Sequence, residues 1–262
     1  MHLPSFVLLA LLAHTASAME VNVPTDLTLV NLTRVEYDSA GSEAYYWHEG
    51  RLWARWETDY PQAEHNFAKR LGELTRLQTA RVPIKRRLTD SDLGDFPLIY
   101  MSDMGYASFT PEEAEALRAY LDNGGFLWAD DFWGDAEWAN FERFMHRVLP
   151  GNHWREVPIV HPIFHTVFEH EEMPQIPAEN FARPWSTTSE PAWVHRPPAG
   201  SLERASMRGY FDEDGRLMVI GTHNTDVADG WEREAYGQWY FEHFSTKSYR
   251  LGVNVFTYVL TH

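Results

Sequence analysis

The chain has 262 residues, of which 44% are hydrophobic, and this is enough for the core of one large α/β domain or two small ones. Its formal net charge of −16 makes nucleic acid and anionic membrane surfaces poor partners, and leaves a small neutral ligand, a cation or a cell-envelope protein. Because the chain contains no cysteine, disulfides, thiolate metal sites and a cysteine nucleophile are excluded.

The first 18 residues predict a signal peptide. The apolar run Phe6–Ala13 is followed by the small residues of an A-x-A pattern at positions 16–18, so cleavage is expected after Ala18. This run is too short to span a bilayer as a stable helix. We therefore expect a periplasmic or secreted protein with a single α/β domain, residues 19–262, and no stable membrane span. An unprocessed membrane anchor is the alternative.

The first part of the predicted domain contains a strand and a helix. The β-rich stretch Leu27–Tyr37 predicts the strand. Pro61 fits the first turn of the helix, which would start at Asp59 or Tyr60. Apolar residues spaced four and three apart give this helix one buried face: Phe67, Leu71 and Leu74.

A βαβ unit follows. The sequence FPLIYMSD, residues 96–103, predicts a buried strand that ends in polar residues. Thr110, Pro111 and Glu113 then predict the start of a helix, as N-cap, first residue and capping-box glutamate. A glycine pair ends this helix, and the apolar stretch 126–129 predicts the next strand. Short connections between a strand, a helix and a strand require parallel pairing.

The remaining segments complete a three-layer α/β sandwich with a mostly parallel sheet. Their predicted elements are a helix over residues 135–148, a turn or short helix from His161, an irregular Pro-rich stretch over 173–198, strands RASMRGYF and RLMVIGTH joined by the turn DEDG, and a closing helix over 249–260.

Ligands of an open parallel sheet bind beyond the carboxyl ends of its strands, so the polar residues at these ends are candidates for a site. They are Ser102 and Asp103, Asp130 and Asp131, His161 and His165, and His223 with Asn224 and Asp226.

Asp130 and Asp131 are adjacent, and adjacent strand residues point to opposite faces. We expect one of them to cap the following helix or to pair with an arginine, and the other to face the crevice. A purely structural role for both, as helix cap and loop carboxylate, stays open.

The spacing of His161 and His165 suits two metal ligands, although packed or hydrogen-bonded imidazoles are the commoner outcome. The segment GTHNTDVADGWE, which includes Trp231 and Glu232, is denser in polar groups than a turn requires, and this favours function. Trp133 and Trp231 could stack on a sugar ring, although core packing is the usual role of tryptophan.

In addition to these patterns, the chain resembles the family called domain of unknown function 4159. The resemblance extends from about residue 28 to the C-terminus and is carried in order by VEYDSAG, WETDYPQAEHNFAKRLGELT, RLTDSDLGDFPLIYMSD, LRAYLDNGGFLWADD, HPIFH, DGWE and LGVNVFTYVLTH.

This resemblance implies a flavodoxin-like fold of the class I glutamine amidotransferase-like and ThuA-like kind. In amidotransferases the strand that matches GGFLWADD leads to a catalytic cysteine, and here Asp130 or Asp131 stands at that place. Thioester chemistry is therefore excluded, and the histidine that ThuA-like proteins carry near this strand end is also missing. The family supplies no activity that could be transferred.

Two hypotheses of function follow. In the first, the chain is a hydrolase-like enzyme or ligand-binding protein for a neutral ligand, with Asp130 or Asp131 reactive and His223, Asp226 and Glu232 assisting. In the second, it is a non-catalytic binding or scaffolding module of the cell envelope. No motif demands a cofactor. A divalent metal is compatible, since carboxylates favour a hard ion and the histidines would admit zinc.

Overall fold

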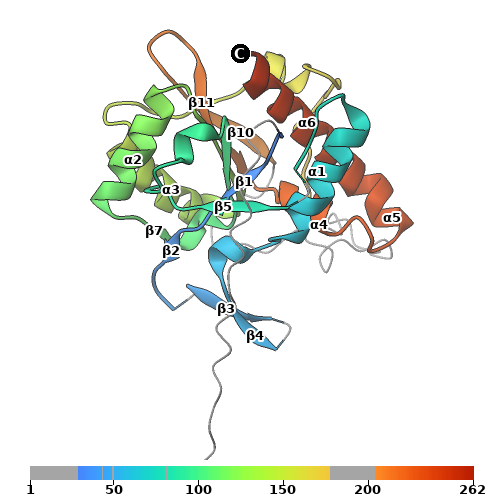
Figure 1. Cartoon of the computed structure of the whole chain (residues 1–262), viewed down its shortest axis with the longest axis horizontal. Coiled ribbons are helices and arrows are strands. Elements are labelled where there is room, and N and C mark those ends of the chain that lie inside the picture. Colours follow the sequence, from blue (N-terminus) through green and yellow to red (C-terminus); the bar gives the residue numbers. More distant parts are fainter. Residues whose placement is uncertain (1–28, 43, 49, 81, 178–203) are drawn as a thin grey trace, which may run out of the picture.

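A mixed β-sheet forms the centre of the protein (Figure 1). The computed structural model describes residues 29–42, 44–48, 50–80, 82–177 and 204–262. In this part of the chain, seven strands pair in the order β5-β1-β6-β8-β11-β10-β9, and the strands from β5 to β11 are parallel. The strands of this sheet are β1 (Thr33–Val35), β5 (Ile84–Arg86), β6 (Leu98–Met101), β8 (Phe126–Phe132), β9 (Arg155–Glu156), β10 (Ser206–Phe211) and β11 (Leu217–His223).

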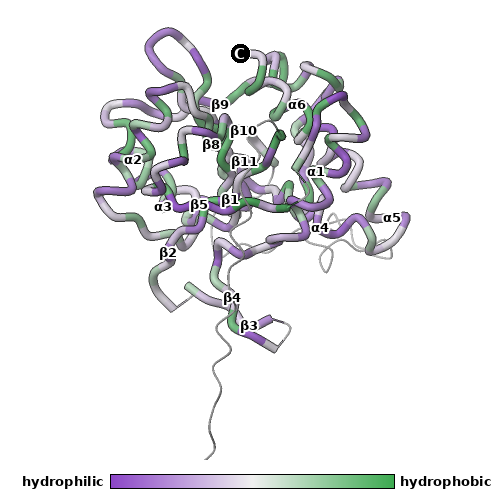
Figure 2. Tube along the Cα trace, in the orientation of Figure 1, coloured by the Kyte–Doolittle hydropathy of each residue, from purple (hydrophilic) through white to green (hydrophobic). Residues whose placement is uncertain are grey.

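Helices cover both faces of the sheet (Figure 1). Alternate residues of the buried strands point to opposite faces, so Ile99 and Leu127 pack against α2 and α3, whereas Tyr100 and Trp128 pack against α1, α4 and α6. Figure 2 shows the hydrophobic residues concentrated between these layers. The helices are α1 (Gln62–Leu74), α2 (Pro111–Asp122), α3 (Gly134–Val148), α4 (Val227–Glu232), α5 (Gln238–Tyr240) and α6 (Thr246–Thr261).

The order of the parallel strands confirms the predicted fold class. Numbered as they occur along the chain, the five parallel strands lie in the order 2-1-3-4-5, which is the flavodoxin-like order. Ligands of such sheets bind where the strand order reverses, here between the carboxyl ends of β1 and β6. The fold thus directs attention to the residues that follow these two strands and β8 beside them.

Local signals predicted several boundaries correctly. The Thr110 side chain accepts a 3.1 Å hydrogen bond from the backbone N–H of Glu113, and the Glu113 carboxylate accepts one from the backbone N–H of Thr110. Pro111 is the first residue of α2, as predicted. His161 likewise caps the short 3₁₀ turn Pro162–Phe164, and its Nδ1 accepts a hydrogen bond from the N–H of Ile163.

Other boundaries differ from the predictions. The first strand is only three residues long, and β8 runs through both aspartates to Phe132 instead of ending at Ala129. The segment after β11 forms the helix α4 instead of a loop. A hairpin that was not predicted, β3 (Tyr45–His48) and β4 (Arg51–Ala54), projects from the body of the molecule (Figure 1). A second small sheet pairs β2 (Asp38–Ser39) with β7 (Ala107–Ser108).

Two expectations concern residues that the structure does not describe. The signal peptide, residues 1–18, and most of the Pro-rich segment 173–198 lie outside the described ranges. Within those ranges, no helix combines the length and the apolar composition needed to cross a bilayer.

Candidate functional site

Asp130 lies at the junction of the sheet and α4, and it is fully buried. Its Oδ2 accepts a 2.6 Å hydrogen bond from the Tyr100 hydroxyl and bonds of 2.8 and 3.1 Å from the backbone N–H groups of Val227 and Ala228. Its Oδ1 accepts a hydrogen bond from the Thr222 hydroxyl. With four donors around it, this carboxyl group connects β6, β8 and β11 to the N-terminus of α4.

Asp131 occupies a different environment. Its backbone is in the left-handed region, with φ of 60°, and its Oδ1 accepts a 2.7 Å hydrogen bond from Nε1 of Trp133 in the following turn. Burial raises the pKa of Asp131 well above its ordinary value, and the charges of Asp103, Glu137 and other carboxylates raise it further. The protonated form of Asp131 is therefore favoured more than that of an exposed carboxyl group.

Asp131 belongs to a group of carboxyl groups that we call the acidic cluster. Burial, followed by the charge of Asp131 and then that of Asp229, raises the pKa of Asp226 well above its ordinary value. Burial and the charges of Asp229 and Glu232 do the same for Asp59. The members of the acidic cluster are Asp59, Asp103, Asp131, Asp226, Asp229 and Glu232.

The backbone around the acidic cluster is strained. Among the described residues other than glycine, four have a positive φ: Asp59, Asp103, Asp131 and Asn224. Each of them follows or ends a parallel strand or precedes α1, and three belong to the acidic cluster. Strained backbone of this kind concentrates at functional sites, because the surrounding structure must hold it in place.

Two arginines neutralise part of the negative charge. Arg55 donates a 2.9 Å hydrogen bond to Oδ2 of Asp103, to which the Thr58 hydroxyl also donates. Burial raises the pKa of Asp103, these bonds lower it, and the resulting value is about 6. Arg233 lies 3.2 Å from Oδ1 of Asp229 and also contacts Glu232.

A buried arginine of β1 fixes the position of the segment that carries Asp59. Arg34 donates hydrogen bonds to the carbonyl oxygens of Trp56 and Thr58, at 3.2 and 2.8 Å, and forms a 2.7 Å ion pair with Glu64. The guanidinium also lies 4.9 Å from the centre of the Tyr100 ring. Arg34 thus fixes the segment before α1 against the sheet.

The comparison with protein families identifies the chain at the level of its family. A family model described as "Domain of unknown function (DUF4159)" matches residues 32–260. The chain belongs to this family. No curated protein matches the chain. The DUF4159 domain therefore includes the whole sheet and every residue of the acidic cluster.

In the DUF4159 domain, four of the residues that the sequence singled out lie close together, namely Asp103, Asp131, Asp226 and Glu232. Asp130 is fully buried next to Asp131, at the junction of the sheet and α4. Asp226 caps α4, since its side chain accepts a 3.0 Å hydrogen bond from the N–H of Asp229. The helix that follows β8, α3, is instead capped by Glu137, which accepts a bond from the N–H of Trp133, and by Asn224, which accepts one from Gly134.

The predicted histidines of the DUF4159 domain lie elsewhere. His223 packs against Trp138 on the α3 side of the sheet, and its Nε2 lies 3.0 Å from the carbonyl oxygen of Gly134. His161 contacts Phe211, which pairs with the first residue of β11, so it lies at the opposite edge of the sheet. Both ring nitrogens of His165 are engaged, with Glu169 and with the carbonyl oxygen of Ile159.

The remaining predicted residues support the site from within the core. Trp231 is fully buried and packs on Phe67 with ring centres 4.5 Å apart. Trp133 is 5% exposed. Ser102 is fully buried, and its carbonyl oxygen accepts a hydrogen bond from the Tyr37 hydroxyl.

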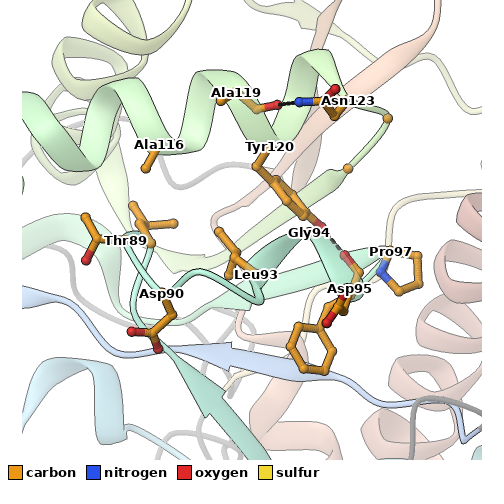
Figure 3. A pocket seen from close by; sticks show the side chains of 14 residues that line it. Thr89, Asp90, Leu93, Gly94, Asp95, Pro97, Ala116, Ala119, Tyr120 and Asn123 are labelled. Atoms are coloured by element: carbon orange, nitrogen blue, oxygen red, sulfur yellow. Dashed lines mark hydrogen bonds between the residues drawn. The ribbon is translucent and has the colours of Figure 1, made fainter.

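A separate groove of about 500 Å³ lies at the amino ends of β6 and β8 (Figure 3). Residues before β6, such as Leu93 and Pro97, line one side, and Tyr120 of α2 and the C-cap residue Asn123 line the other. This groove lies at the amino ends of the parallel strands, whereas the acidic cluster lies at their carboxyl ends, so the two are independent features.

Sequence reasoning missed Asp59 and did not select Asp229. The place of Asp59 just before Pro61 indicates only a helix start, and nothing local indicates that Asp59 meets α4. The spacing of Asp226, Asp229 and Glu232 is i, i+3, i+6, and it would have indicated one helix face if α4 had been predicted.

Proposed function

We propose that the acidic cluster is a ligand-binding pocket of hydrolase type in which Asp131 is the reactive carboxyl group. The convergence of carboxyl groups at one edge of the sheet supports this proposal. They come from the ends of β6 and β8, from the segment before α1, and from α4 and its N-cap after β11. Asp130 is assigned to the framework, because its oxygens are already bonded to four donors.

The environments of Asp131 and Asp103 suggest their roles. Burial raises the pKa of Asp131 and so favours its protonated form, which can donate a proton or a hydrogen bond to an oxygen of a neutral ligand. Asp103 has a pKa of about 6 beside Arg55, so it is ionised at pH 7 and can accept a proton. Carboxyl groups held in different protonation states are suited to general acid–base catalysis.

The resemblance to amidotransferase-like proteins is in keeping with this assignment. Those proteins carry their nucleophile at the turn after the matching strand, and here Asp131, with φ of 60°, interrupts the regular backbone of β8 one residue before its end. Asp131 thus takes the place of the nucleophile in a chain without cysteine. The reaction would be hydrolysis of a small neutral substrate such as a saccharide: Asp103 accepts a proton from the attacking water, the bond to the leaving oxygen breaks, and Asp131 donates a proton to that oxygen.

A panel of chromogenic neutral glycosides and esters tests the proposal. We expect hydrolysis of at least one compound by the wild type, and a loss of about 10²-fold or more in Asp131→Asn. Asp122→Asn, at an exposed position on α2, is the matched control and should retain full activity. Equal turnover by Asp131→Asn and the wild type would contradict the role of Asp131.

A second candidate is binding of a cell-envelope protein, and the β3–β4 hairpin favours it. Trp47 is 73% exposed, and Leu52, its partner across the hairpin, is 56% exposed. An exposed apolar pair on a projecting hairpin is suited to a protein contact. This candidate gains support if no compound of the panel binds and Trp47→Ser abolishes a complex that the wild type forms in cells.

Export of the chain is part of the proposal and depends on the first 18 residues. N-terminal sequencing of the protein expressed with its native leader should give Met19 as the first residue. An intact Met1 in the folded protein would contradict processing.

A further inference from the structure

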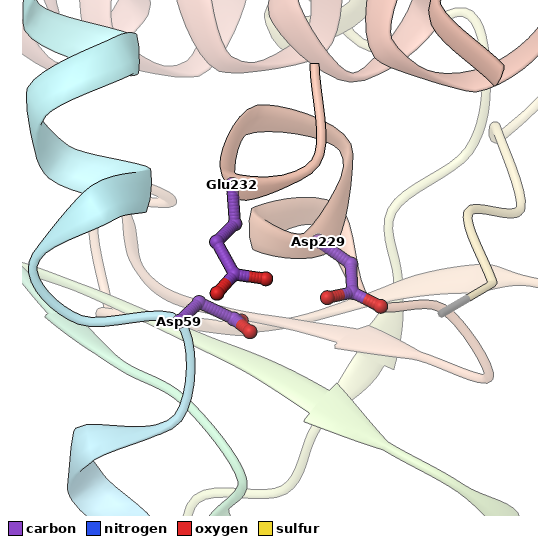
Figure 4. Close-up of side chains that lie close together, drawn as sticks. All are labelled: Asp59, Asp229 and Glu232. Carbon is purple, nitrogen blue, oxygen red and sulfur yellow. The ribbon is translucent and has the colours of Figure 1, made fainter. Parts of the chain in front are cut away.

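Three carboxyl groups of the acidic cluster point toward one another at a single place (Figure 4). Asp59 comes from the segment before α1, and Asp229 and Glu232 come from α4. One oxygen of each lies within 4.8 Å of the others. Two oxygen ligands on opposite sides of one Ca²⁺ are about 5 Å apart, so these three oxygens can reach the same ion.

Asp59 provides an independent indication that something is bound there. The residue is only 8% exposed, and its Oδ2 is a buried atom with no hydrogen-bond partner among the described residues. A buried carboxylate oxygen without a partner loses its hydration, and native structures rarely leave such an atom without a ligand. This oxygen belongs to a side chain that points at Asp229 and Glu232 (Figure 4).

The three side chains are held on fixed elements. Arg34 anchors the carbonyl oxygens that precede Asp59, and the N–H of Ala63 donates a 2.9 Å hydrogen bond to the carbonyl oxygen of Asp59 itself. On the other side, Asn66 of α1 donates a 2.8 Å hydrogen bond to the carbonyl oxygen of Trp231 in α4. The ligand positions are therefore fixed before an ion arrives, which reduces the cost of binding it.

The chemistry of the donors selects the kind of ion. All three groups are carboxylates, and Arg233 neutralises part of their charge from one side through contacts with Asp229 and Glu232. No histidine belongs to the group, since His161, His165 and His223 have other contacts. An all-oxygen donor set favours a hard cation over zinc.

We propose that Asp59, Asp229 and Glu232 bind one hard divalent cation of the Ca²⁺, Mg²⁺ or Mn²⁺ class. The ion brings compensating charge to three carboxylates that otherwise repel one another. It also supplies a partner for the buried Oδ2 of Asp59. Its binding does not require the reactivity proposed for Asp131, so either proposal can fail while the other holds.

Calorimetric titration of the full chain, freed of metal with EDTA, tests the site with CaCl₂, MgCl₂ and MnCl₂ separately. We expect one ion per chain with a Kd below about 1 mM for at least one of these ions, and weaker binding of ZnCl₂. The titrations use NaCl at matched ionic strength, because a chain of net charge −16 attracts cations without a specific site. Failure of all three ions to bind stoichiometrically would overturn the proposal.

The variant Asp59→Asn separates an ion site from a merely structural role. Without metal its melting temperature should rise, because an amide has no ionised form that burial and the two neighbouring carboxylates would disfavour. Asp59→Asn should also lose the increase in melting temperature that the ion gives the wild type. Its affinity for the ion should be at least tenfold weaker. Asp122→Asn should retain the ion-dependent increase. If Asp59→Asn lowers the metal-free melting temperature and keeps the ion-dependent increase, the proposal is wrong.

A second pair of variants checks the other ligands and the independence of Asp131. Glu232→Gln should also weaken the ion by at least tenfold, whereas Asp131→Asn should keep binding at one ion per chain. Loss of hydrolysis with retained ion binding in Asp131→Asn would support both proposals. Retained ion binding in both Asp59→Asn and Glu232→Gln would place the ion elsewhere.

Discussion

Asp130 and Asp131 are neighbours in the chain, but four donors surround the carboxylate of Asp130, whereas Asp131 turns away in a left-handed backbone conformation and accepts its hydrogen bond from Trp133. One residue therefore stabilises the fold, and the other can meet a ligand. We therefore expect the same substitution, Asp→Asn, to have different effects on the free energy of unfolding at positions 130 and 131.

Asp130→Asn should destabilise the protein, because an amide offers one acceptor oxygen where the carboxylate uses two. If the amide oxygen keeps the bonds from Val227 and Ala228, the amide nitrogen faces the hydroxyl of Thr222 and cannot accept its hydrogen bond. We expect a loss of about 1–3 kcal/mol, because one buried bond is lost and the others go to a neutral acceptor instead of a carboxylate. Asp131→Asn should leave the free energy of unfolding unchanged or raise it at pH 8, since burial disfavours the ionised form that Asp131 adopts in the unfolded chain at this pH. Urea unfolding of both variants measures the difference, and equal losses would contradict the assignment.

Tyr100→Phe should lower the free energy of unfolding by about 1.5–3 kcal/mol, because the buried Asp130 carboxylate loses a 2.6 Å hydrogen bond. Tyr45→Phe is the control, since Tyr45 is 55% exposed on the hairpin, and it should change the free energy by less than about 0.5 kcal/mol. Denaturant midpoints at pH 7 test both values. A neutral effect of Tyr100→Phe would show that Asp130 does not depend on this donor.

His223 should make stability depend on pH. Burial lowers its pKa to about 4, from an unfolded value of about 6.5, so the unfolded chain binds more protons between these values. The contribution of the neutral imidazole is thus complete above pH 6.5 and is lost as the pH falls toward 4, up to about 3 kcal/mol.

The comparison of wild type with His223→Gln isolates this effect from that of the carboxylates. The free energy of unfolding of the wild type, minus that of His223→Gln, should decrease between pH 7 and pH 4. A pH-independent difference for His223→Gln would mean that the buried imidazole does not titrate as expected.

Gly230→Ala should displace α4. A methyl group at Gly230 would lie 2.4 Å from Cβ of Ser248 in α6, which requires the two helices to move apart. We expect a loss of stability of about 1–3 kcal/mol, together with weaker binding of a divalent ion, because Asp229 and Glu232 belong to the displaced helix. Gly215→Ala is unsuitable as a control because φ there is 87°, whereas Gly94→Ala meets open space and should be tolerated.

The sequence predicted the parts of the fold that depend on local signals. The capping residues Thr110 and Glu113 and the apolar stretch from Phe126 determine their elements within a few positions, so α2 and β8 were recognised. The sequence did not predict the helix α4, because Asn224, Asp226 and Gly230 are turn-type residues. The first turn of α4 is stabilised by hydrogen bonds that its backbone N–H groups donate to Asp130, which is far away in the chain.

The candidate site was predicted only in part for the same reason. The rule that ligands bind beyond strand ends selected Asp103, Asp131 and Asp226 correctly as neighbours in space. Asp59 and Asp229 lie close together although they are 170 positions apart in the chain. The periodic spacing of apolar residues gives no information about a contact between positions so far apart. His161 and His165 had suitable spacing, but their own loop satisfies their ring nitrogens.

The contact between α1 and α4 has a further consequence for a chain without cysteine. An ion held by Asp59 and Asp229 would close a loop of about the length that a long-range disulfide closes, and would restrict the unfolded chain in a comparable way. Unlike a covalent cross-link, it could be installed and removed without redox chemistry. Mechanical stability of the domain would then follow the local concentration of the ion, so the same molecule would be more resistant to unfolding in a calcium-rich medium than in a chelating one.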